Sequence, residues 1–438
     1  MTINLSGGFH VEMPKMVPIK QNFNKQKIED INGHMDGEFI KFLKNQRSRL
    51  TKGSKIAIAV GSRGIHDILP VVKRLIYNLK AIGVTPVVIP AMGSHGGATA
   101  EGQVAVLKAL GITEASVGAE IISSMKVTEI GRTPKGVSVY VENNALNSDG
   151  IIIINRVKPH TGFKGSVESG LLKMIAIGLG KQKGATVTHN RGFDTFPTLL
   201  EDMTRVALQK SPIIGGLAIV ENAYKHSANI ELIQPERIIE RDKELLNISK
   251  ELFPRIKLDP VDVLIVQEMG KEISGPGMDP NITGRSASKF FKRELTEAPK
   301  IDRMIVLELT EKTKGNATGL GTADVTTKDL FHSINFDDTY ANVITSTVLE
   351  AGRIPVVMEN DLQALQVALK CCSRVAHPQS KIVWIKNTLS LEYIYVSETY
   401  LSQIQKDKTI EILGEPEKIP FTEDGKLQLK NRILKYKK

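Results

Sequence analysis

Three histidines in this chain follow short apolar segments, and each sits in a loop that contains glycine. They are His66 in GSRGIHD, His95 in AMGSHGG and His160 in KPHTGFKG. Imidazole exchanges protons near neutral pH and also binds metals, and glycine lets the backbone approach a ligand closely. His66 adjoins Asp67 at the start of a predicted helix, where both residues can simply cap the helix. His95 and His160 are therefore the stronger candidates for an acid/base pair.

The segments around these loops alternate between apolar strands and amphipathic helices. Strands are predicted at 55–60, 84–90, 137–142 and 149–157, and helices at 68–83 and 100–111. This alternation predicts an α/β fold with a mostly parallel sheet. The carboxyl ends of parallel strands share one edge, so we expect the histidine loops to meet there. Each loop also leads into a helix, and helix N-termini, together with Arg63 in the first loop, favour an anionic ligand.

A polar segment bounded by prolines, residues 254–260, interrupts this pattern, and the alternation resumes with VDVLIVQEMG. We therefore predict two α/β domains with an interdomain cleft: a cofactor-binding domain at 1–258 and a domain at 259–438 that closes the cleft. In the second domain, Gln267 and Lys271 follow the first predicted strand and are expected to face that cleft.

The composition limits the class of partner. The 438 residues include 58 basic and 48 acidic ones, a net charge of +10, but only 5% are aromatic. Without basic runs interleaved with aromatic residues, a small anion is favoured over nucleic acid. No apolar run of about eighteen residues and no signal-peptide pattern occur, and the only cysteines are Cys371 and Cys372, so a cytoplasmic protein that does not act on a membrane is expected. The protein could also form a homo-oligomer, a question that the sequence leaves open.

The stretch from Pro159 to His189 is unusual because Lys173 interrupts its apolar run, and His189 follows sixteen positions later. With GSRGIHDIL, GSHGG and KPHTGFKG, this spacing resembles the nickel-dependent lactate racemases and their relatives. The residues SGLL precede Lys173, where the archetype of that family has Gly-Gly-Arg. Lys181 and Lys183 therefore remain alternatives for the lysine that the family can tether to its cofactor.

The resemblance implies a cofactor and a set of roles. The cofactor is a nickel-pincer nucleotide, pyridinium-3,5-bisthiocarboxylic acid mononucleotide nickel. Lys173 would form the tether, His189 would be the fourth nickel ligand, and His95 and His160 would be the acid/base pair. The other implied residues are Arg63 at the carboxylate or phosphate, Gly162 and Gly165 along the cofactor, and Gln267 and Lys271 around the substrate.

The function implied by the resemblance is a racemase or epimerase of a 2-hydroxy acid. In that family the α-hydrogen leaves as hydride to the pincer carbon while a base takes the hydroxyl proton. Two alternatives remain: a relative with the same cofactor that acts on a larger sugar acid, and a non-catalytic protein that binds phosphate or a nucleotide. A dinucleotide dehydrogenase is disfavoured, because no Gly-x-Gly-x-x-Gly lies between the first strand and helix.

Overall fold

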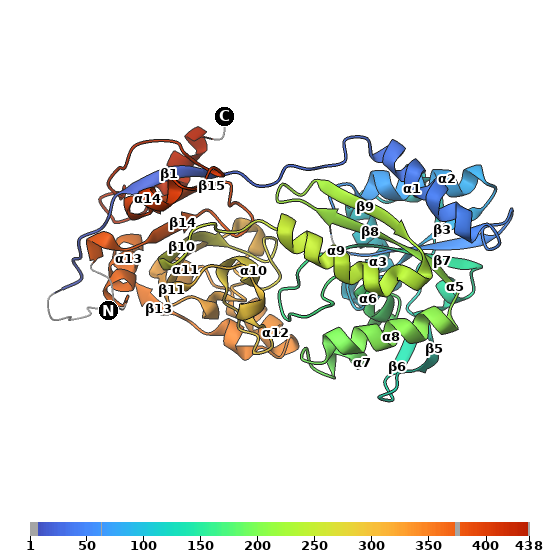
Figure 1. Ribbon diagram of the computed structural model, residues 1–438. Coiled ribbons are helices and arrows are strands. Elements are labelled where there is room, and N and C mark those ends of the chain that lie inside the picture. Colours follow the sequence, from blue (N-terminus) through green and yellow to red (C-terminus); the bar gives the residue numbers. More distant parts are fainter. Residues whose placement is uncertain (1–7, 63, 373–376, 437–438) are drawn as a thin grey trace. The chain divides into compact units, whose positions relative to one another are not determined.

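The computed structural model describes residues 8–62, 64–372 and 377–436. The chain forms two compact units (Figure 1). One unit is Asn24–Phe253, and the other is Pro254–Lys438 together with the N-terminal segment that ends at Phe23. None of the helices in the described parts of the chain has the length and apolarity needed to cross a membrane.

The unit Asn24–Phe253 is built on a six-stranded sheet. Its order is β4 (Glu120–Ile121), β3 (Thr85–Pro90), β2 (Lys55–Val60), β7 (Gly150–Arg156), β8 (Ile213–Glu221) and β9 (Ser227–Ile233). All neighbouring strands are parallel except the antiparallel pair β8–β9. The central strands are almost continuously buried, which explains their unbroken apolar sequences. The predicted parallel sheet is confirmed.

Two apolar cores cover the two faces of this sheet. Alternate residues of β2 belong to different cores: Ile56 and Ile58 pack with one, and Ala57 and Ala59 with the other, as the twofold periodicity of a strand requires. The helices of this unit are α1 (Ile31–Gln46), α2 (Ile68–Ala81), α3 (Ala100–Ala109), α4 (Glu114–Val117), α5 (Asn143–Leu146), α6 (Leu171–Lys173), α7 (Lys181–His189), α8 (Phe196–Lys210) and α9 (Ile238–Leu252).

The predicted strand at 137–142 does not join the parallel sheet. It forms β6 (Ser138–Glu142), which pairs antiparallel with β5 (Val127–Arg132) in a separate two-stranded sheet. Val139 and Val141 on β6 are buried, whereas Ser138 and Tyr140 are partly exposed. This alternation is typical of a strand with one covered face, and it distinguishes β6 from the continuously buried strands.

The second unit contains an eight-stranded sheet. Its order is β13 (Val356–Met358), β12 (Val325–Thr327), β11 (Ile301–Leu309), β10 (Val261–Met269), β14 (Ile382–Ile385), β15 (Tyr393–Ser397), β1 (Met16–Gln21) and β16 (Ile410–Ile412). The strands from β13 to β14 are parallel, and the remaining pairs are antiparallel. Its helices are α10 (Pro280–Thr283), α11 (Lys328–His332), α12 (Phe336–Thr345), α13 (Asp361–Lys370), α14 (Leu401–Ile404) and α15 (Leu429–Ile433).

The division of the chain differs from the expected ranges 1–258 and 259–438. One boundary between the two units lies at Pro254, within the proline-bounded segment. However, β1 pairs with β15 and β16, so the N-terminal segment belongs to the C-terminal unit. The partners of β1 lie more than 370 residues away in the sequence (Met16 opposite Ser397), and local periodicity carries no information about such a pairing.

Candidate functional site

The loops that follow β2 and β3 meet the short segment η2, Met174–Gly178, which continues directly from α6. A Cβ atom at Gly61, just after β2, would lie 2.4 Å from Met174 Cε. The amide of Gly93, just after β3, donates to the carbonyl of Gly178 across 3.2 Å. The expected meeting of these loops at one edge of the sheet is therefore confirmed.

The end of β7 contacts the residue that precedes α6. Asn155 Nδ2 donates to the carbonyl of Gly170, the residue before α6, across 2.7 Å. The segment η2 is a single π-helical turn between α6 and α7, and such turns are frequent at functional sites. Lys173 is the last residue of α6 and so stands where the helical geometry changes.

Asp242 on α9 holds the start of α6. Its Oδ1 accepts from the amide of Leu171 at 2.8 Å, and the carboxylate also accepts from the amide of Leu172. Burial raises the pKa of Asp242 to about 6, against the opposing effect of the two amides. A Cβ at Gly170 would lie 2.3 Å from Asp242 Oδ1, so glycine is needed for this approach. The sequence analysis missed this residue.

Lys173, His160 and His189 lie close enough to influence one another electrostatically. Desolvation holds the pKa of His160 well below its usual value, and the positive charge of Lys173 is the next largest cause. Desolvation and then Lys173 also lower the pKa of His189. Both imidazole rings lie against Phe193, with centroid separations of 6.1 Å for His160 and 5.6 Å for His189. Three of the predicted site residues are thus brought together.

The backbone of His160 is anchored at both polar groups. Its amide donates to Glu168 Oε2 at 2.6 Å, and its carbonyl accepts from Lys164 Nζ at 2.9 Å. Lys164 and Glu168 form an ion pair of 3.1 Å with side chains 1% and 0% exposed, and Lys250 contacts Glu168 Oε1 at 3.1 Å. This buried cluster fixes the loop after β7.

The ring of His160 has a defined hydrogen-bonding direction. The amide of Gly162 donates to His160 Nδ1 across 2.9 Å. A backbone amide can only donate, so Nδ1 must present its lone pair and the neutral ring carries its proton on Nε2. Gly162, expected along the cofactor, therefore orients His160. The close approach at Gly165 is to Pro197, whose Cγ would lie 2.4 Å from a Cβ at that glycine.

His95 occupies the neighbouring loop and is exposed. Its Nδ1 forms a short hydrogen bond with Ser62 Oγ from the loop after β2. Gln103 on α3 also contacts this loop: its Nε2 donates to the carbonyls of Gly93 at 2.9 Å and His95 at 3.3 Å. Arg63, predicted to bind a carboxylate or phosphate, lies outside the described residues.

The three alternative tether lysines have different surroundings. Lys173 is partly buried beside His160 and His189. Lys181 is completely buried, and its amine donates to Pro90 O and Gln103 Oε1. Lys183 is exposed, with its amine 6.0 Å from the centre of the Tyr140 ring. Of the three, only Lys173 lowers the pKa of both histidines.

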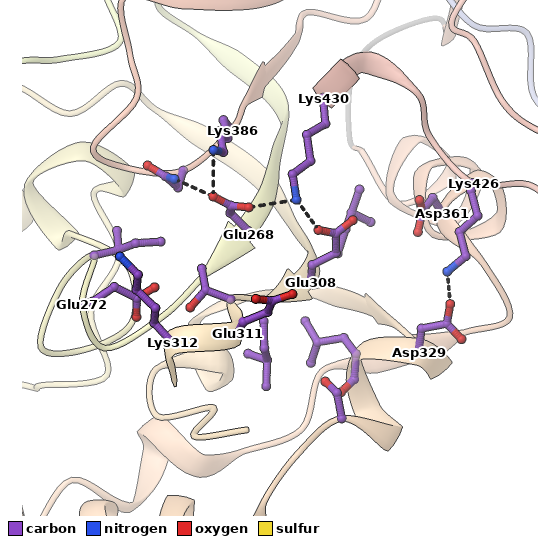
Figure 2. Close-up of a pocket in the computed structure, with 17 residues that line it drawn as sticks. Glu268, Glu272, Glu308, Glu311, Lys312, Asp329, Asp361, Lys386, Lys426 and Lys430 are labelled. Carbon is purple, nitrogen blue, oxygen red and sulfur yellow. Dashed lines mark hydrogen bonds and ion pairs between the residues drawn. The ribbon is translucent and has the colours of Figure 1, made fainter. Parts of the chain in front are cut away.

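The second unit has a cavity of about 870 Å³ at the carboxyl ends of its parallel strands. Figure 2 shows Lys386 and Lys430 converging on Glu268, with Nζ to carboxylate distances of 3.5 and 2.9 Å. Lys430 also contacts Glu308 at 2.8 Å. Most charges at the centre of this cavity are therefore paired within the chain.

Gln267 and Lys271, expected around a substrate, do not line that cavity. Gln267 is 1% exposed, its Nε2 donates to Glu308 Oε1 at 2.8 Å, and its Oε1 accepts from Trp384 Nε1 at 2.9 Å. Both ends of its amide are thus hydrogen-bonded within this unit. Lys271 is partly exposed, and its Nζ donates to Asn342 Oδ1 at 2.9 Å.

Comparison with known proteins finds one family model that matches part of the chain. Residues 44–196 match the family model described as the lactate racemase N-terminal domain, a range that contains His95, His160, Lys173 and His189. No curated protein matches the chain. Among the described residues, no three or more His, Cys, Asp or Glu side chains are grouped so as to hold a metal ion.

Two solved structures match this chain at low sequence identity. The lactate racemase apoprotein from Thermoanaerobacterium thermosaccharolyticum has a TM-score of 0.51 and 14% identity, over 85% of this chain and 99% of that one. A crystal structure of a protein from Thermotoga maritima has a TM-score of 0.47 and 14% identity, over 83% and 97% of the two chains. In sequence over residues 44–196, and in fold through the lactate racemase apoprotein, this chain is similar to the lactate racemases.

Proposed function

We propose that this protein is a racemase or epimerase of a small 2-hydroxy acid. The observation that carries the proposal is the proximity of Lys173, His160 and His189 at the sheet edge, inside the range that matches the lactate racemase N-terminal domain. A cationic residue beside two histidines of lowered pKa suits an anionic substrate and proton transfer near neutral pH.

The residues present fit a nickel-pincer nucleotide. His189 is an exposed residue whose ring has a lowered pKa, so at neutral pH the ring is uncharged and has a lone pair for a metal. The Lys173 amine stands beside it and is the proposed site of attachment. When bound, this cofactor would supply reversible hydride transfer at Cα of the substrate.

The proposed task of the chain's own histidines is to move the hydroxyl proton. One imidazole takes that proton from one enantiomer, and the other returns a proton when the carbonyl is reduced on its opposite face. His160 in the tautomer described above can donate a hydrogen bond from Nε2 to a substrate oxygen, but only its imidazolium form can return a proton. To accept a proton at Nε2, it would have to give up the bond from Gly162. His95, with Nδ1 bonded to Ser62, is the proposed partner.

Several cations are proposed to hold the substrate anion. Lys158 and Lys173 lower the pKa of His160 and so contribute positive potential at its ring, whereas the buried Lys164 is paired with Glu168. Arg63 remains a proposed ligand for the carboxylate or the cofactor phosphate, and Lys271 remains a proposed contact of the substrate. Gln267 is not proposed, because both ends of its amide are bonded within the second unit.

The test uses full-length protein produced together with the enzymes that make the cofactor. We expect bound nickel, a covalent mass increment on the peptide that contains Lys173, and interconversion of the enantiomers of one member of a 2-hydroxy acid panel, followed by chiral chromatography. His189→Ala should lose nickel and keep its fold, whereas the control His332→Ala, at an exposed histidine of the second unit, should keep both.

Three outcomes would contradict the proposal or its mechanism. Protein that is exposed to the cofactor but retains no nickel, or that binds a nucleotide without interconverting any hydroxy acid, would favour the non-catalytic alternative. Rapid entry of solvent deuterium at Cα would replace hydride transfer with enolate chemistry.

A further inference from the structure

Both the side chain and the backbone of Lys181 are in environments that cost free energy. Its side chain is completely buried at the start of α7, and none of the described carboxylates forms an ion pair with it. Its backbone has a φ of 52°, a conformation that residues other than glycine rarely adopt. Burying an amine without a carboxylate and holding such a backbone both cost free energy. A residue with these costs is expected to have a specific role.

The hydrogen bonds of Lys181 determine how Gln103 is oriented. Gln103 is 0% exposed on α3, and its Oε1 accepts from Lys181 Nζ at 2.6 Å. An ammonium group can only donate, so the oxygen of the amide must face Lys181. The NH₂ group must then face the opposite way, where it donates to the carbonyls of Gly93 and His95.

These bonds connect two parts of the proposed site. Lys181 is the first residue of α7, and His189 is the last. Through Gln103, the start of α7 is linked to the loop that carries His95. We infer that Lys181 and Gln103 are positioning residues that hold the His95 loop in place relative to the helix of His189. The effect on catalysis rests on the proposed function, but the effect on the loop does not.

Gln103→Glu separates positioning from general stability. The new carboxylate can still accept from Lys181, and it gains an ion pair with it. However, it has no N–H to donate to the carbonyls of Gly93 and His95, and it repels them. Lys181→Met is the second variant, because it keeps the length of the side chain and removes the group that orients Gln103. Lys183→Met, two residues along α7 at an exposed lysine, is the matched control.

Hydrogen exchange on the full-length protein without cofactor reads out the loop directly. The amides of His95 and Ala98 donate to Met92 O and Ser94 O, so they report opening of this turn. In Gln103→Glu we expect their exchange to rise by about tenfold or more, the scale set by two ordinary buried hydrogen bonds. Exchange in β8 should not rise, and the melting temperature should not fall. The ¹⁵N signals of the His95 ring should also shift as its contact with Ser62 is lost.

The inference is overturned if Gln103→Glu leaves both the loop exchange and the His95 ring signals as in the wild type. If Lys181→Met fails to fold, the measurements on Gln103→Glu still test the positioning role. With cofactor-loaded protein, Gln103→Glu should lower kcat more than it changes KM. If Gln103→Glu loosens the loop but the cofactor-loaded wild type racemises no hydroxy acid, only the proposed function is refuted. Normal racemisation with an unchanged loop in Gln103→Glu would refute the positioning role alone.

Discussion

Asp242 on α9 accepts the amide of Leu171 at 2.8 Å, in the first turn of the helix that ends at Lys173. A buried carboxylate thus supports, from a distant part of the chain, the lysine that influences both His160 and His189. Carboxylates at helix N-termini are favourable because they satisfy free amides and complement the helix dipole. Burial nevertheless raises the pKa of Asp242, so the stability that this residue contributes depends on pH.

Asp242→Asn should become more stable relative to the wild type as pH rises from about 4 to 7. The pKa of Asp242 is raised from 3.8 to about 6 in the folded protein, so the folded state binds this proton more tightly than the unfolded state. The contribution of protonation is complete below pH 4 and is lost as pH rises through 6. The change over that range should reach about 3 kcal/mol at most.

Urea unfolding of both proteins at several pH values measures this difference. Asp194→Asn, at an exposed aspartate, should show little change with pH relative to the wild type. A stability difference between Asp242→Asn and wild type that stays constant from pH 4 to 7 would mean that Asp242 titrates normally.

Lys173→Met should raise the pKa of both His160 and His189. Lys173 lowers both pKa values through its positive charge, so its removal makes each imidazolium easier to form. Titration of ¹⁵N-labelled histidine side chains by NMR measures the two values without any cofactor. The same spectra report the tautomer of His160, which we expect to carry its proton on Nε2.

Lys183→Met is the matched control, because that lysine is exposed and is not among the charges that affect either histidine. If Lys173→Met leaves both titrations unchanged, Lys173 does not lie beside the two histidines.

Glu168→Gln should destabilise the protein by about 3–5 kcal/mol, because it leaves the buried Lys164 without its counter-charge. The double variant Glu168→Gln with Lys164→Met should recover much of that loss, since it removes the uncompensated charge as well. Denaturant unfolding measures both. Glu201→Gln, at a partly exposed carboxylate beside Arg205 and Lys243, should cost about 1 kcal/mol or less. Equal losses of unfolding free energy in Glu168→Gln and Glu201→Gln would show that burial does not strengthen the dependence on the ion pair.

His95→Ala and His160→Ala should each reduce racemisation in both directions, because every turnover uses one histidine to take a proton and the other to give it back. General acid–base groups contribute about 10²–10⁴ in rate. Initial rates from each pure enantiomer, with nickel content measured in parallel, separate proton transfer from cofactor loss. Near-normal rates in either variant would remove that histidine from the acid/base pair.

Sequence reasoning was most successful where local patterns carry the information. The apolar runs at 55–60 and 261–269 became β2 and β10, and the parallel topology brought the loops after β2, β3 and β7 to one edge. The supporting side chains were not foreseen, because contacts such as Lys181 with Gln103 join residues 78 positions apart. Asp242 did leave a signal: it interrupts the apolar face formed by Ile238 and Leu245 on α9.

The placement of β1 makes the unit Asn24–Phe253 an insertion within the second unit. During synthesis, residues 24–253 can form their own sheet and cores while β1 still lacks both of its neighbours, since β15 and β16 emerge more than 370 residues after it. The second sheet can be completed only when nearly the whole chain exists. A fragment that begins at Pro254 would expose the edges of β15 and β16 that β1 normally covers, and unpaired strand edges promote aggregation. A shortened chain meant to isolate the second unit should therefore reconnect β1 to Pro254 by a linker in place of residues 24–253.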